Sequence, residues 1–110
     1  GERDLYSSKT KDYIIKNLAL GNATVRSLCN ELNIDRTTLQ RKLKREGTCF
    51  SDILDAIRRS MAVAYLKEGH RIKSISNLLG YSESSAFQHR FKQWFGESPG
   101  QYRTRLSKKP

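Results

Sequence analysis

The sequence contains few prolines and cysteines and no long hydrophobic run. The prolines are Pro99 and Pro110, so a proline-rich linker is excluded and helices are favoured. The cysteines are Cys29 and Cys49, too few for a disulfide scaffold and in keeping with a reducing compartment. No stretch approaches the roughly 18–20 apolar residues of a membrane span, and the N-terminus has no apolar signal region. A membrane-spanning protein and a secreted precursor are therefore not expected.

Motifs of catalysis are missing as well. The sequence has no glycine-rich phosphate loop, no HExxH and no GxSxG, so we expect no catalytic residue, no cofactor and no enzyme. Cys29, Cys49, His70 and His89 would by number suffice for a zinc site. These four residues lie about 20 positions apart without a closely spaced ligand pair, which argues against metal binding.

Acidic residues are scarce relative to basic ones. The 110 residues include 11 Asp and Glu against 21 Lys and Arg, which gives a formal net charge of +10. A charge of this size favours polyanionic partners, namely DNA, RNA or an anionic membrane surface. Hydrophobic residues make up 36% of the chain, enough for one small domain or for two very small ones.

Apolar residues recur at helical spacing along the chain, and no β-type alternation is evident. The pattern predicts an all-α fold of seven helices, which span residues 8–20, 25–32, 36–46, 51–68, 72–79, 83–95 and 99–106. Thr24, Asp35 and Ser51 are the expected N-caps, and Asn33 is expected in a left-handed turn. The longest helix is expected to bury a stripe of six residues: Ile53, Leu54, Ile57, Met61, Ala64 and Tyr65.

The chain contains an internal repeat. Residues 25–32 (VRSLCNEL) align with residues 72–79 (IKSISNLL), and residues 39–44 (LQRKLK) align with residues 87–92 (FQHRFK). Each copy reads as a short helix, a turn and a basic second helix. This order is typical of a helix-turn-helix.

Equivalent positions of the two copies predict their cores. Cys29 and Ser76 fall in the middle of the first helix, where the partner helix crosses closely and a small side chain is needed. Cys29 is therefore expected to be a small core residue rather than a reactive thiol. The expected core of the first copy consists of Leu28, Leu32, Ile34, Leu39 and Leu43. That of the second copy consists of Ile72, Ile75, Leu79, Tyr81, Phe87 and Phe91.

The second helix of the first copy is the expected DNA-reading element. With Leu39 and Leu43 inward, its outer face carries Arg36, Thr37, Gln40, Arg41, Lys44 and Arg45. Arg can pair with guanine, Gln with adenine and Thr with a thymine methyl group, while Lys and flanking Arg reach phosphates. A solvated charged face is the plainer interpretation. Five basic residues and one acid within residues 36–46 favour recognition instead.

The second copy presents a less charged outer face. With Phe87 and Phe91 inward, the outer residues are Ser84, Ser85, Gln88, His89 and Lys92, and Arg90 near the edge is expected to contact phosphate. Taken alone, this helix is expected to be the weaker binder. His89 is expected to be a polar DNA contact or a plain surface histidine, because no orienting carboxylate or second ligand is nearby.

The longest predicted helix separates the two copies. Its 18 or so residues would span roughly 27 Å at about 1.5 Å per residue, which is compatible with one DNA turn of roughly 34 Å. A monomer would then read a bipartite site through successive major grooves. The DNA would have to bend if the two recognition helices lie closer than one pitch.

These motifs resemble a known family. Residues 80–103 (GYSESSAFQHRFKQWFGESPGQYR) closely resemble the signature of the AraC/XylS family of bacterial transcription regulators. Features that look like the family's first motif and linker helix stand upstream: residues 39–44 with Gly47, and Arg58 followed by Ala62, Tyr65 and Leu66. The resemblance covers roughly residues 8–106.

The resemblance implies two helix-turn-helix subdomains joined by a long linker helix. The implied organisation is an N-terminal segment 1–7, a first subdomain 8–50, the linker helix 51–68, a second subdomain 69–106 and a tail 107–110. By position, the family's base-reading sites fall on Thr37, Gln40, Arg41, Ser84, Ser85, Gln88 and His89. Arg71 stands where the family commonly has a capping Ser or Thr, so the following helix is expected to be frayed at its start.

The function implied by the resemblance is sequence-specific binding of double-stranded DNA by a bacterial transcription regulator, an activator by family analogy. Its location would be cytoplasmic, with nucleoid association through DNA. RNA polymerase is an expected partner, as is an N-terminal effector-binding or dimerisation domain absent from this chain; a membrane is not. The alternative, a sequence-indifferent cationic module for nucleic acid or anionic membrane, is disfavoured because the charges cluster on defined helices without an aromatic platform.

Overall fold

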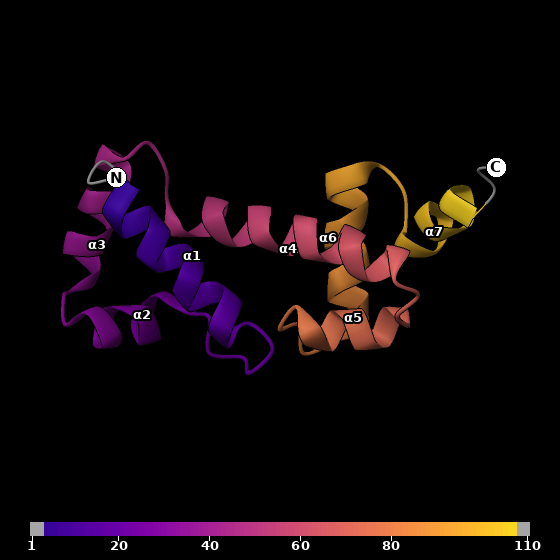
Figure 1. Cartoon of the computed structure of the whole chain (residues 1–110), viewed down its shortest axis with the longest axis horizontal. Helices are drawn as coiled ribbons and strands as arrows, with labels where there is room; N and C mark the ends of the chain where they lie inside the picture. The colour runs from indigo at the N-terminus through magenta and orange to yellow at the C-terminus, as the bar shows by residue number, and fades with distance from the viewer. Residues whose placement is uncertain (1–3, 108–110) are drawn as a thin grey trace. The chain divides into compact units, whose positions relative to one another are not determined.

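Seven helices and no strand make up residues 4–107, the part of the chain that the computed structural model describes (Figure 1). In chain order they are α1 (Leu5–Asn17), α2 (Val25–Leu32), α3 (Arg36–Arg45), α4 (Phe50–Lys67), α5 (Ile72–Leu78), α6 (Ser84–Phe95) and α7 (Pro99–Ser107). The predicted all-α fold is confirmed. The chain divides into two compact units, Gly1–Ile57 and Arg58–Pro110, with the division inside α4.

The first helix differs most from its predicted bounds. It spans Leu5–Asn17 rather than residues 8–20, whereas the other six begin and end within one residue of the predicted positions. Leu20, which the periodicity assigned to this helix, follows its end and is 70% exposed. The helix therefore begins and ends one turn nearer the N-terminus than apolar spacing predicts.

A distant carboxylate explains the early start of α1. Asp4 stands at the N-cap but its side chain makes no capping hydrogen bond. Instead, the backbone N–H groups of Tyr6 and Ser7 donate to Oε2 and Oε1 of Glu46, at 3.0 and 2.9 Å. Since the first N–H groups of a helix have no partner within the helix, this carboxylate supplies what the local sequence lacks.

The start of α4 also differs from the prediction of a Ser51 cap. The N–H of Ile53 donates to the carbonyl of Cys49 at 3.1 Å, and the helix begins at Phe50. Ser51 therefore lies in the first turn, where its hydroxyl is 3.4 Å from the Cys49 thiol.

The buried side of α4 was predicted correctly only in part. Ile53 is buried, as expected, but Ala64 is exposed. Ala62 and Leu66 are buried in the second half of the helix instead, with exposed fractions of 0% and 3%. The prediction for Ala64 was therefore wrong, because Ala62 and Leu66 lie on the side of the helix away from Ala64.

Leucine side chains of α2 and α3 form the core of the first unit with two residues of the α1 segment. Leu28, Leu39 and Leu43 are each at most 1% exposed, as are Ile14 and Leu18. Three of these five residues were predicted from the repeat. Their packing fixes which side of α3 remains outside.

Aromatic side chains dominate the core of the second unit. Phe87 and Phe91 of α6 are fully buried, and their ring centroids lie 5.9 Å apart. Phe91 also contacts Phe95 and Tyr102, at 4.6 and 5.5 Å between centroids. The repeat predicted Phe87 and Phe91, but it has no counterpart for the aromatic residues that follow them. Their rings join α7 to α6.

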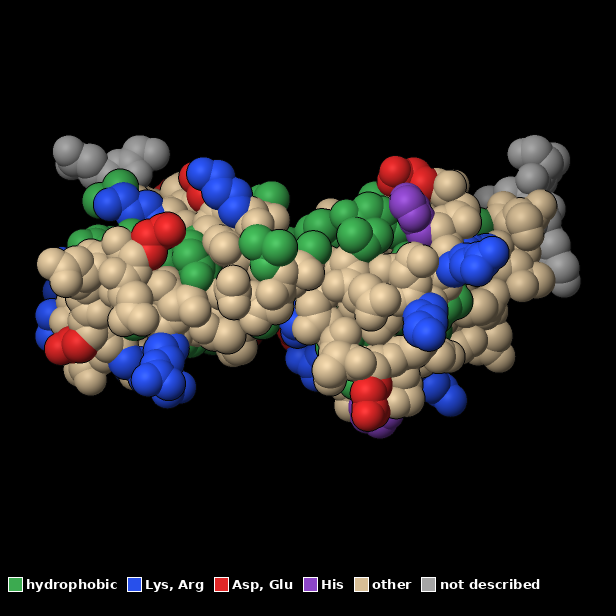
Figure 2. Space-filling view, turned by 90° about the horizontal axis from the view of Figure 1, so that it is seen from below, with side chains coloured by type: hydrophobic (Ala, Val, Ile, Leu, Met, Phe, Trp, Pro, Cys, Tyr) green, Lys and Arg blue, Asp and Glu red, His purple; other side chains and the backbone are tan. Residues whose placement is uncertain are grey.

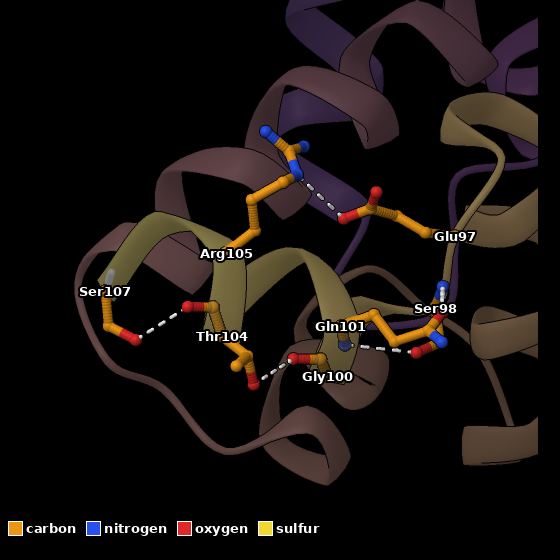
Figure 3. A network of polar contacts seen from close by, with 7 residues as sticks. All are labelled: Glu97, Ser98, Gly100, Gln101, Thr104, Arg105 and Ser107. Carbon is orange, nitrogen blue, oxygen red and sulfur yellow. Dashed lines mark hydrogen bonds and ion pairs between the residues drawn. The ribbon is translucent and has the colours of Figure 1, made fainter. Parts of the chain in front are cut away.

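The start of α7 is a reciprocal capping box, drawn in Figure 3. The N–H of Gln101 donates to the hydroxyl of Ser98 at 3.1 Å, and the N–H of Ser98 donates to Oε1 of Gln101 at 2.9 Å. Pro99 occupies the first turn, where its missing N–H costs nothing. Arg105 reaches back to Glu97 at 3.2 Å.

Candidate nucleic-acid interface

Local side-chain caps shape the first helix-turn-helix. Thr24 accepts a hydrogen bond from the N–H of Ser27 at 3.1 Å and so caps α2. Asn33 follows α2 with φ of 57°, in the left-handed region. Asp35 then accepts from the N–H of Thr38 at 2.7 Å and caps α3. All three predictions for this turn are confirmed.

The pKa of Asp35 reflects its capping role. Hydrogen bonds from the Thr38 side chain and backbone lower the pKa of this carboxyl, and the positive charge of Arg41 adds to the effect. A carboxylate at a helix N-terminus also interacts favourably with the helix dipole. Asp35 is therefore ionised near neutral pH and keeps the start of α3 in place.

The outer face of α3 carries the six residues that the helical wheel predicted there. All six are exposed: Arg36, Thr37, Gln40, Arg41, Lys44 and Arg45. Their cationic groups form no ion pair with a carboxylate of residues 4–107. The face therefore offers positive charge and hydrogen-bond donors of the kinds that phosphates and base edges accept.

A groove of about 400 Å³ lies along one side of this face. Its lining includes the apolar residues Leu39, Leu43 and Phe50. Arg36 and Lys44 are among its polar lining residues. Two residues that line the groove, Arg36 and Lys44, are thus also candidate DNA contacts.

Arg58 fastens the turn of the second helix-turn-helix. Its Nε donates to the carbonyl of Leu79 at 2.9 Å, and its guanidinium carbon lies 4.3 Å from the centroid of the Tyr81 ring. Tyr81 in turn packs on Phe87 at 5.8 Å between centroids. The turn between α5 and α6 is therefore held from α4. These contacts give a structural role to Arg58, one of the residues that resemble the family's linker helix.

The buried Ser76 adds a second tie to this turn. It is 1% exposed, and its hydroxyl donates to the carbonyl of Glu83, the residue before α6, at 3.2 Å. Cys29, its counterpart in the first copy, is 8% exposed, and burial together with the nearby Asp35 charge raises the pKa of its thiol. Both residues are small core residues, as predicted. Arg71 makes no side-chain cap at α5.

The outer face of α6 is polar, and several of its groups already contact one another. Ser85, Gln88, His89 and Lys92 are exposed, whereas Ser84 and Arg90 are partly buried. The amide of Gln88 donates to the Ser84 hydroxyl at 3.1 Å. Two candidate base-reading residues therefore pair along the helix.

A residue that sequence reasoning missed links two of the predicted contacts. Gln93 accepts a hydrogen bond from Nη1 of Arg90 at 3.0 Å, and its amide nitrogen lies 3.3 Å from Nε2 of His89. The Arg90 guanidinium also lies 6.0 Å from the Trp94 ring centroid. The i, i+4 spacing of His89 and Gln93 is the signal that could have revealed this contact.

Within 4–107, no group of three or more His, Cys, Asp or Glu side chains is arranged to hold a metal ion. The helices in this range are all too short or too polar to cross a membrane. Lys and Arg side chains lie at the surface of both units on the face in Figure 2.

Two buried cores that each leave a polar recognition helix exposed define a helix-turn-helix DNA-binding domain. A family model described as a helix-turn-helix domain matches residues 28–105. The chain belongs to the AraC/XylS family of transcription regulators, which confirms the resemblance carried by residues 80–103. The alternative of a sequence-indifferent cationic module is not favoured.

Relatives and a solved structure agree with this assignment. VirS, a transcriptional regulator of Mycobacterium tuberculosis, is 38% identical over 87 residues, which cover 78% of this chain and 26% of VirS. The Escherichia coli transcriptional activator CfaD is 32% identical over 100 residues, 90% of this chain and 37% of CfaD. The crystal structure of a DNA-binding transcriptional dual regulator from Escherichia coli K-12 has a TM-score of 0.83 at 26% identity, covering 94% of both chains. The chain thus spans about a quarter of the length of curated relatives such as VirS.

Proposed function

We propose that this domain binds a bipartite double-stranded DNA site in a sequence-specific way, each unit inserting one recognition helix into a major groove. The supporting observation is that α3 and α6 bury matched hydrophobic residues, Leu39 with Leu43 and Phe87 with Phe91. The opposite sides of both helices hold side chains that can read base edges. Sequence is read through such contacts, whereas phosphate contacts fix the register.

In the first unit, Thr37, Gln40 and Arg41 are the proposed base-reading residues. Arg41 can donate to O6 and N7 of guanine, Gln40 can pair with adenine, and the methyl group of Thr37 can contact thymine. Arg36, Lys44 and Arg45 flank them and are assigned to phosphates. Exposure and the absence of competing ion pairs within residues 4–107 support these roles.

In the second unit, the proposed base-reading residues are Ser84, Ser85, Gln88 and His89. Arg90 and Lys92 are assigned to phosphates or to flanking contacts. This helix has less positive charge than α3, so it contributes less to affinity.

Selection from a random duplex library at about 150 mM salt, with sequencing of the bound pool, tests the proposal. Two enriched blocks about one helical turn apart would support the bipartite assignment. A single block would mean that one helix alone reads bases. Binding without enrichment would contradict sequence-specific recognition.

Substitution of Arg41 tests an individual contact. Arg41→Ala is expected to cost about 1–3 kcal/mol on the selected site and to relax the preference at one base pair. Lys16→Ala, an exposed change on α1, is the matched control and should leave the preference intact. Equal loss of affinity on selected and random duplexes would contradict base reading by Arg41.

The full regulator is proposed to act as a transcription activator in the bacterial cytoplasm, in contact with nucleoid DNA. The name of CfaD as an activator supports this role. RNA polymerase and an N-terminal effector-binding or dimerisation domain are the proposed partners. The greater length of relatives such as VirS supports the second of these. Reporter transcription from a promoter carrying the selected site, with and without the regulator, would distinguish activation from repression.

A further inference from the structure

Three neighbouring side chains on α6 form a directed hydrogen-bond chain. Nη1 of Arg90 lies 3.0 Å from Oε1 of Gln93, and Nε2 of Gln93 lies 3.3 Å from Nε2 of His89. His89 and Gln93 are both exposed, so the chain lies on the outer surface of the second recognition helix. Gln93 is the middle member, and it has no role in the proposed function.

The chemistry of the three groups fixes the direction of this chain. A guanidinium can only donate, so the Gln93 atom that faces Arg90 is its carbonyl oxygen. The amide nitrogen therefore faces His89, and an amide nitrogen can only donate. Nε2 of His89 must consequently accept, which requires a lone pair on that nitrogen. The neutral ring then carries its proton on Nδ1, because the hydrogen bond of one ring nitrogen sets the state of the other.

We propose that Gln93 is a positioning residue for base reading, because it holds His89 in the neutral Nδ1–H tautomer. This proposal rests on the assignment of His89 as a base-reading residue. In this tautomer the nitrogen left for DNA is a donor. It matches the acceptors of the major groove, N7 of purines, O6 of guanine and O4 of thymine, and does not match the N4 amino group of cytosine.

Nitrogen-15 NMR of the imidazole rings of the free protein at about pH 8, where an ordinary histidine is neutral, tests the first half of the proposal. The chain has two histidines, and His89→Asn assigns the signals. We expect a protonated Nδ1 and an unprotonated Nε2 for His89. Gln93→Met should abolish this bias, whereas Asn77→Met, an exposed change on α5, should leave it unchanged. A His89 ring protonated mainly on Nε2 in the unaltered protein would overturn the proposal.

Gln93→Glu provides a directional test of the same contact. A carboxylate accepts from both neighbours, Arg90 and His89, so the imidazole proton should move to Nε2 and Nδ1 should become the acceptor. The added negative charge will weaken binding to every duplex, but the relative enrichment of sequences within one selection does not depend on that common factor.

Selections from the random duplex library test the second half of the proposal, the effect of Gln93 on base preference. They are made with the unaltered protein, Gln93→Met and Gln93→Glu. At the base that His89 contacts, the unaltered protein should select against cytosine. Gln93→Met should reduce this discrimination by a factor of about 2–10, as expected for one hydrogen bond, and Gln93→Glu should shift the preference towards cytosine or adenine. An unchanged preference in both variants would overturn the proposal. Failure of the unaltered protein to enrich any second block would instead contradict the proposed function, and the NMR result would still stand.

Discussion

Removing the Glu46 carboxylate is expected to loosen the start of α1. Both of its oxygens accept backbone N–H groups of the first turn, those of Tyr6 and Ser7. Loss of a side-chain cap costs about 0.5–2 kcal/mol. Glu46→Ala removes two hydrogen bonds and should lie near the upper end, about 2 kcal/mol. Glu46→Gln keeps one acceptor oxygen without the charge and should cost about 1 kcal/mol.

Amide hydrogen exchange followed by NMR measures this effect at the site. The amides of Tyr6 and Ser7 should exchange roughly 5–30-fold faster in the variants, since 1–2 kcal/mol corresponds to factors of this size. Glu31→Gln, an equal loss of charge at an exposed position of α2, is the control and should leave both amides unchanged. Unchanged exchange of these amides in Glu46→Ala would refute the capping role.

The dependence of this stabilisation on pH follows from the same geometry. Burial alone would raise the pKa of Glu46, but the hydrogen bonds from Ser7 and Tyr6 outweigh it and the pKa lies below its ordinary value. The folded state therefore binds this proton less readily than the unfolded state does. The contribution is complete above the ordinary glutamate pKa of about 4.3 and is lost as the pH falls through the lower pKa of the folded state. Urea midpoints of the unaltered protein and of Glu46→Gln should converge in that range.

Three further changes test other parts of the fold. Arg58→Met leaves the Leu79 carbonyl without its donor and should destabilise the second unit by about 1–3 kcal/mol, measured by urea unfolding with Trp94 fluorescence. Arg58→Lys should lose less stability than Arg58→Met. Equal urea midpoints for Arg58→Met and the unaltered protein would contradict the role of Arg58 in holding this turn. Ser98→Ala breaks the capping box of α7 and should lower the free energy of unfolding by about 1 kcal/mol in the same assay. An unchanged urea midpoint would show that the capping box does not stabilise the protein. A thiol reagent should modify exposed Cys49 rapidly and buried Cys29 only near the unfolding midpoint, whereas rapid reaction of both would contradict the packing of α2.

Local chemistry explains which parts of the fold could be predicted. Thr24, Asn33 and Asp35 act on backbone groups at most four residues away, so their roles follow from the adjacent sequence. The cap on α1 comes from Glu46, 40 residues away from Tyr6, and no spacing rule points to it. The sequence pattern therefore placed the turn correctly and the start of the first helix incorrectly.

The candidate site divides in the same way. Helical periodicity placed the outer face of α3, because burial of Leu39 and Leu43 leaves one side of a helix outside. Periodicity says nothing about bonds among the exposed groups themselves. The contact of Gln93 with His89 depends on side-chain orientations that neither residue specifies alone, and only the presence of Arg90 on the other side of the amide makes its direction definite.

These contacts also make the two recognition helices energetically unequal. On α6, the Gln88 amide already has a partner in the Ser84 hydroxyl, so a DNA contact that replaces this bond exchanges one hydrogen bond for another. Within residues 4–107, the side chains of Gln40 and Arg41 on α3 have no such protein partner, and contacts with DNA replace water instead. A DNA contact from Nδ1 of His89 would leave the bond between His89 and Gln93 in place, so it involves no such exchange. The block read by α3 should therefore carry more of the affinity. Base-pair changes in that block should reduce binding more than changes in the other, and the opposite order would show that pairing along α6 prepares the helix for DNA rather than competing with it.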